Sequence, residues 1–101
     1  QLCTPASIDS IDSSNGQEDH VSMGANAATK LARVIDNCYA IQGIELMHAC
    51  QALEFRRPAK SGSKSEALVA KFRTHVPFVK EDGYMHPLIQ KSKEFVKNNV
   101  A

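Results

Sequence analysis

The chain has 101 residues, and its 12 Lys and Arg against 11 Asp and Glu leave a formal net charge of +1. This near balance excludes a nucleic-acid-binding protein that relies on bulk positive charge, and 43% hydrophobic with 23% charged residues excludes a wholly disordered chain. The length permits one domain at most, and no apolar run reaches the roughly 20 residues of a membrane helix. We therefore expect neither nucleic acid nor a membrane among the partners of this chain.

The segment 1–19 is expected to form an irregular loop. It is rich in Ser, Asp and Asn, a composition that favours turns over helix. Glu18 and Asp19 are expected in or just before the first turn of the following helix, where the helix dipole favours carboxylates. Ser14 and Gln17 have the spacing of a capping box, which would start that helix a few residues earlier.

A long helix is predicted over about residues 20–56, within a segment 20–57. This stretch contains good helix formers, and no proline occurs in it before Pro58. Apolar residues recur in it at steps of three and four, which is helical periodicity; they are Leu31, Val34, Ile35, Cys38 and Ile41. Arg56 and Arg57 place cations near the last carbonyls, and the proline then ends the helix.

Two short helices are predicted in the segment 63–101. The first runs from about Lys64 to Val76 after a Ser63-x-x-Glu66 capping box, and the second runs from about Pro87 to Asn98. Together with the long helix they predict an all-α fold.

The second half of the long helix is apolar around most of its circumference. Between Cys38 and Leu53 the polar residues are few, and a helix of this kind is buried on most of its faces. The two short helices bury too little surface to cover it. We therefore expect partner helices, either from other chains or from a missing part of the same chain. We prefer the second source because the sequence opens with Gln-Leu-Cys rather than with Met.

The cysteines and histidines predict no metal site and no disulfide. Cys3, Cys38 and Cys50 show no Cys-x-x-Cys spacing, so we expect reduced core residues of a cytoplasmic protein. None of the histidines has a partner four residues away on one helix; they are His20, His48, His75 and His86. His48 lies on the mostly apolar helix and is expected to be a hydrogen-bonded core residue.

One dense polar cluster, residues 13–20, couples a glycine-containing turn to a predicted helix start. Such junctions present side chains and free amides to ligands. Glu18 and Gln17 place a carboxylate beside an amide, a pair that would hold a polar group of a substrate. The same residues would also serve to cap the helix, and the spacing alone does not choose between the two roles.

Four stretches of the sequence resemble the histidine ammonia-lyase family. Residues 5–11 read Pro-Ala-Ser-Ile-Asp-Ser-Ile, and residues 17–24 read Gln-Glu-Asp-His-Val-Ser-Met-Gly. Gly-Ile-Glu-Leu at 43–46 and Ala-Cys-Gln-Ala-Leu-Glu-Phe-Arg at 49–56 are similar to the family's long-helix pattern. The resemblance covers about the first 57 residues and weakens after them.

The resemblance implies an all-α homotetramer with a central bundle of long helices, of which this chain would be a C-terminal part. It implies removal of ammonia from L-histidine to give trans-urocanate. The electrophile of the family is a methylidene-imidazolone (MIO) group formed from an internal Ala-Ser-Gly. That tripeptide does not occur in these 101 residues. The group is therefore expected upstream, in the rest of the lyase polypeptide, and the isolated chain is predicted to be inactive.

The resemblance also assigns roles to individual residues. Glu18 matches the family's active-site glutamate, which implies a catalytic and substrate-binding role, and Gln17 matches the adjacent glutamine. Relatives that act on phenylalanine typically carry Gln in place of Glu18, so the glutamate favours histidine. Gly16 departs from the Asn that many members carry there, and the role of His20 stays open.

Two other functions compete with this interpretation. One is a phenylalanine or tyrosine ammonia-lyase or an aminomutase of the same fold. The other is a helical oligomerisation module without chemistry.

Overall fold

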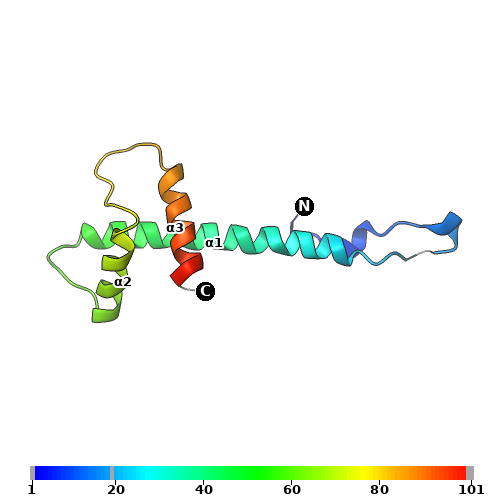
Figure 1. The fold of residues 1–101 in the computed structure, drawn as a ribbon, viewed down its shortest axis with the longest axis horizontal. Coiled ribbons are helices and arrows are strands. Elements are labelled where there is room, and N and C mark those ends of the chain that lie inside the picture. Colours follow the sequence, from blue (N-terminus) through cyan, green and yellow to red (C-terminus); the bar gives the residue numbers. More distant parts are fainter. Residues whose placement is uncertain (1, 19, 100–101) are drawn as a thin grey trace. The chain divides into compact units, whose positions relative to one another are not determined.

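A computed structural model of the chain describes residues 2–18 and 20–99. Within these residues the regular structure is helical, with no strand, and this confirms the all-α prediction. Three α-helices follow two short 3-10 turns (Figure 1); the turns are Ala6–Asp9 and Ser14–Gly16, and the helices are α1 (Gly24–Glu54), α2 (Ser63–Arg73) and α3 (His86–Asn99). The chain divides into two compact units, Gln1–Asn37 and Cys38–Ala101, and α1 contributes to both.

Helix α1 begins at Gly24, about four residues later than predicted. The cause is a long-range contact: the amide of Val21 donates to the hydroxyl of Ser10 at 3.1 Å, which holds this stretch in an extended arm. Glu18 therefore lies six residues before the helix, and its predicted place in or beside the first turn is wrong. Ser14 occupies a 3-10 turn instead of a cap, so the predicted capping box is also wrong. The predicted capping role of Asp19 falls outside the described residues.

The ends of the shorter helices differ from the prediction for similar reasons. Gly62, rather than Ser63, occupies the N-cap position of α2. Glu66 does not close a capping box, because its Oε1 atom accepts from the amide of Ser61 at 2.8 Å and from Arg57 at 3.0 Å. Helix α3 starts one residue before Pro87, in agreement with the role of proline in a first helical turn.

The hydrophobic core lies in the unit Cys38–Ala101. It joins side chains from the second part of α1, from α2 with the residues that follow it, and from α3; they are Met47, Cys50, Val69, Phe72, Val76 and Phe95. The rings of Phe72 and Phe95 meet edge to face, with centroids 5.2 Å apart. Gly43 lets α3 cross α1 closely, because a Cβ atom on it would lie 2.7 Å from the backbone nitrogen of Lys93.

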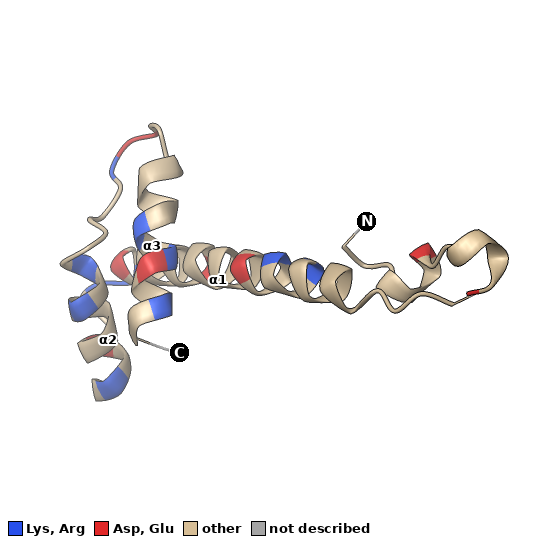
Figure 2. Cartoon of the chain, turned by 45° about the vertical axis from the view of Figure 1, so that its right-hand side comes forward, with Lys and Arg blue, Asp and Glu red and all other residues tan. Residues whose placement is uncertain are grey.

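Ion pairs connect the end of α1 to α2. Figure 2 shows acidic and basic residues along all three helices. Glu54 pairs with Arg57 at 3.5 Å and with Arg73 at 3.6 Å, and Arg57 pairs with Glu66 at 2.9 Å. Arg73 also donates to the carbonyls of residues 76 and 77, which helps to end α2 at Arg73 rather than at Val76.

Much of α1 remains exposed in this chain. Only Gly43, Met47 and Cys50 of α1 are buried, whereas Leu31 and Ile41 keep 58% and 63% of their surface. His48 is exposed too, with its Nδ1 atom 2.8 Å from the carbonyl of Ile44, so its predicted place in the core is wrong.

The same correction applies to two of the three free cysteines. Cys3 and Cys38 are exposed and only Cys50 is a core residue. Residues 2–18 and 20–99 hold no helix with both the length and the apolar character to cross a membrane.

Candidate functional site

The predicted site residues lie in a tight antiparallel loop, described over residues 10–18 and 20–21, whose arms run side by side (Figure 1). The amide of Ser13 donates to the carbonyl of Glu18 at 2.9 Å, and the amide of Glu18 donates back at 3.2 Å. Three residues further along both arms, the hydroxyl of Ser10 bonds the amide of Val21 at 3.1 Å and its carbonyl at 3.5 Å. The Ser13–Glu18 and Ser10–Val21 pairs follow the same antiparallel alignment, so they connect the two arms at two successive places.

Three residues in the left-handed region turn the chain between the arms. Their φ angles are 53° at Ser14, 60° at Asn15 and 81° at Gly16. Asn and Gly adopt this region at low cost, which is the local reason for a turn at this place in the sequence. Nothing lies within 4 Å of the position that a Cβ atom of Gly16 would take.

Glu18 lies at the base of this turn and faces solvent with part of its carboxylate. The hydroxyl of Ser13 donates to the Oε2 atom of Glu18 at 2.9 Å. Both Gln17 and Glu18 are exposed, as is His20. A carboxylate has room for about four hydrogen bonds. Glu18 therefore keeps acceptor capacity for a ligand.

A lysine ties the residues that precede this loop to the first turns of α1. The Nζ atom of Lys30 donates to the carbonyl of Thr4 at 3.0 Å and lies 3.8 Å from the carboxylate of Asp9. Sequence reasoning singled out neither Lys30 nor the Ser13 hydroxyl. The Ser13 contact depends on the register of the loop, and the Lys30 contacts join residues far apart in the sequence, so no local pattern encodes either.

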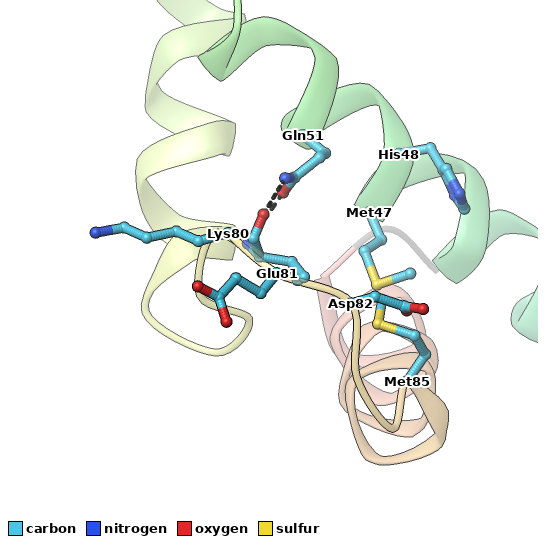
Figure 3. Close-up of a pocket in the computed structure, with 8 residues that line it drawn as sticks. Met47, His48, Gln51, Lys80, Glu81, Asp82 and Met85 are labelled. Atoms are coloured by element: carbon cyan, nitrogen blue, oxygen red, sulfur yellow. Dashed lines mark hydrogen bonds between the residues drawn. The ribbon is translucent and has the colours of Figure 1, made fainter.

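A hollow of about 320 Å³ in the C-terminal unit contains none of the predicted site residues. Met47 and Met85 line it, and the side chain of His48 extends away from them (Figure 3). Gln51 exchanges two hydrogen bonds with the backbone of Val79, donating at 2.7 Å and accepting at 3.2 Å. This glutamine of the Ala-Cys-Gln-Ala-Leu stretch therefore holds the connection between α2 and α3. Within residues 2–18 and 20–99, no three His, Cys, Asp or Glu side chains converge to hold a metal.

Comparison with known proteins decides the family. The sequence model for the aromatic amino acid lyases matches residues 1–74. The chain belongs to this family. The match continues past residue 57, and curated relatives align over 85 to 98 residues, so the similarity extends beyond the stretch that the resemblance was seen to cover.

The curated relatives are named histidine ammonia-lyase. The protein from Roseobacter denitrificans is 42% identical over 97 residues, which are 96% of this chain and 19% of the relative. The Caenorhabditis elegans protein is 41% identical over 98 residues, 97% of this chain and 14% of the relative. The protein from Anaeromyxobacter sp. (strain K) is 46% identical over 85 residues, 84% and 17% of the two chains. This chain thus spans less than one fifth of the length of these relatives.

A solved structure has the same fold. The crystal structure of histidine ammonia-lyase from Trypanosoma cruzi superimposes with a TM-score of 0.88 at 35% identity. The superposition covers 98% of this chain and 20% of that chain.

Proposed function

We propose that this chain is part of a histidine ammonia-lyase, which eliminates ammonia from L-histidine to give trans-urocanate. The observation that carries the proposal is the set of curated relatives of that name, at 41–46% identity over most of the chain. The exposed apolar residues of α1 support a further part of it, that the complete protein buries this helix in a homotetramer. We also propose that this protein is cytoplasmic.

Glu18 would bind the imidazole ring of the substrate. Its carboxylate has one oxygen engaged by Ser13 and remains exposed, so it can accept a charge-assisted hydrogen bond from an imidazole N–H. Against the phenyl ring of phenylalanine the same carboxylate would lose water and gain no partner, which is costly. Gln17 would add an amide beside it for a second polar group of the substrate. The loop therefore favours histidine over phenylalanine.

The proposal requires the MIO group, which supplies the electrophile when it is formed. The loop offers carboxylate, amide and hydroxyl groups, and the sequence contains no Ala-Ser-Gly from which the group is made. The residues of this chain thus fit the binding of substrate and not the formation of the electrophile. We place that formation in the rest of the lyase polypeptide.

The proposal is tested by Glu18→Gln in the complete enzyme, with formation of urocanate as the readout. The substitution keeps the size of the side chain and removes its charge. We expect kcat/KM for L-histidine to fall by more than about tenfold, the scale of a lost charged contact. Asp12→Asn is the matched control, because it neutralises another exposed carboxylate of the same loop. It should change kcat/KM by less than about twofold.

Two results would contradict the proposal. Unchanged kinetics of Glu18→Gln would remove this residue from the substrate pocket. Faster turnover of phenylalanine or tyrosine than of histidine by the unmodified enzyme would replace the proposed substrate.

A further inference from the structure

We propose that Ser13 is a positioning residue that fixes the carboxylate of Glu18 for the substrate. This inference rests on the function proposed above for Glu18 and adds a second residue to the same site. Its basis is the 2.9 Å hydrogen bond from the hydroxyl of Ser13 to the Oε2 atom of Glu18.

The backbone brings these two side chains together. Ser13 and Glu18 are directly opposed in the antiparallel bridge and exchange both of their backbone hydrogen bonds. Opposed residues of an antiparallel pair project from the same face. The short turn between them leaves no freedom in the register, because Ser14, Asn15 and Gly16 all adopt left-handed angles. The hydroxyl therefore stands beside the carboxylate before any substrate arrives.

The hydrogen bond has a clear physical use. A glutamate side chain has several rotatable bonds, and an exposed one samples many rotamers that a ligand must restrict on binding. The bond to Ser13 restricts them in advance and uses only the Oε2 oxygen. Among the described residues no hydrogen bond engages the Oε1 oxygen, whose lone pairs would accept from an imidazole N–H. One oxygen of the carboxylate is thus held by Ser13, and the other is left to bind the substrate.

A second serine provides the matched control. Ser10 forms the second connection between the arms of the same loop. Its hydroxyl bonds the backbone of Val21 and does not touch the carboxylate of Glu18 in this structure. Loss of either hydroxyl loosens the loop, whereas only loss of the Ser13 hydroxyl releases Glu18.

The experiment is a double-mutant cycle on kcat/KM for L-histidine in the complete enzyme. Ser13→Ala is expected to lower kcat/KM about fivefold in the unmodified background, the scale of the net contribution of one ordinary hydrogen bond. In a Glu18→Ala background it should lower kcat/KM by less than about twofold, because no carboxylate remains to be positioned. Ser13→Thr keeps the hydroxyl and should restore kcat/KM to within about twofold of the unmodified enzyme. Ser10→Ala should have the same effect in both backgrounds.

Each outcome has a separate meaning. Equal losses from Ser13→Ala in both backgrounds, or failure of Ser13→Thr to restore activity, would overturn the positioning role. If Glu18→Ala itself leaves kcat/KM unchanged, the proposed function of Glu18 fails first. Thermal unfolding of every variant identifies those that do not fold, and Ser13→Thr then decides the question, since it retains the bond.

Discussion

The two compact units of this chain differ in what holds their residues together. The unit Cys38–Ala101 holds the hydrophobic core and none of the predicted site residues. The unit Gln1–Asn37 holds Gln17 and Glu18, but among its described residues Ala6 is the one buried hydrophobic side chain. Serine hydrogen bonds hold its loop instead, and a lysine holds the residues before the loop against α1. A site built in this way depends on its surroundings for burial and for the exclusion of water.

The largest expected effect is on the isolated chain, which we predict to be inactive and not a stable monomer. The electrophile is missing from its sequence, and apolar side chains on the first part of α1 are exposed, including 58% of Leu31 and 47% of Ile35. Apolar side chains left exposed along one helix favour association with other chains. Urocanate formation and sedimentation velocity test the two statements. A monodisperse monomer that melts cooperatively would contradict the predicted need for partner helices.

The next largest effect is on stability and distinguishes two glycines of α1, Gly24 in the first unit and Gly43 in the second. Gly43→Ala would place a Cβ atom 2.7 Å from the backbone of Lys93, whereas Gly24→Ala would meet only the Ser22 hydroxyl at 3.8 Å. Alanine favours helix over glycine by up to about 1 kcal/mol, but overpacking against backbone costs about 1–3 kcal/mol. We expect Gly43→Ala to destabilise the α1–α3 contact by about 1–2 kcal/mol net.

Hydrogen exchange of the α3 amides in the complete protein measures this difference. Gly24→Ala should leave their opening free energy unchanged. If Gly43→Ala slows exchange in α3, helix propensity outweighs the close crossing and the crossing is looser than the structure indicates.

Local signals predicted all three helices: apolar periodicity predicted the long one, and helix-start patterns with proline positions predicted the two short ones. The errors arose where distant residues compete for the same groups. The hydroxyl of Ser10 accepts a hydrogen bond from the amide of Val21, so α1 starts later than predicted. Arg57 and the amide of Ser61 donate to the carboxylate of Glu66, so this carboxylate does not form a capping box. Neither contact has a signature in nearby sequence.

Burial was predicted least well, and the reason is physical. An apolar helical surface indicates that something covers it, but not whether the same chain does. His48 and Cys38 lie on a helix with few polar residues and are nevertheless exposed in this chain. The candidate site shows the same limit: the polar cluster and the resemblance both singled out Glu18, whereas its contact with Ser13 required the register of the loop.

The smallest expected effect concerns Glu66, whose ion pair lies at the connector between α1 and α2. Two hydrogen bonds lower the pKa of Glu66 from its ordinary value of 4.5 to about 2. The larger contribution comes from the side chain of Arg57 and the smaller one from the backbone of Ser61. A carboxyl whose pKa is lowered by folding stabilises the folded state above its unfolded pKa, and this contribution disappears as pH falls through the folded pKa. The Arg57–Glu66 pair therefore holds the connector between α1 and α2 above pH 4.5 and releases it toward pH 2.

Pepsin cleavage within residues 55–68 of the complete protein tests this release. Glu66→Gln lacks the ion pair at every pH, so the ratio of its cleavage rate to that of the unmodified protein should exceed one at pH 4.5 and approach one near pH 2. The ratio cancels the pH dependence of pepsin itself. The effect is modest because water screens exposed ion pairs. Glu81→Gln, an exposed carboxylate of the same unit, should give a ratio near one throughout. A constant ratio for Glu66→Gln would mean that the pair does not hold the connector.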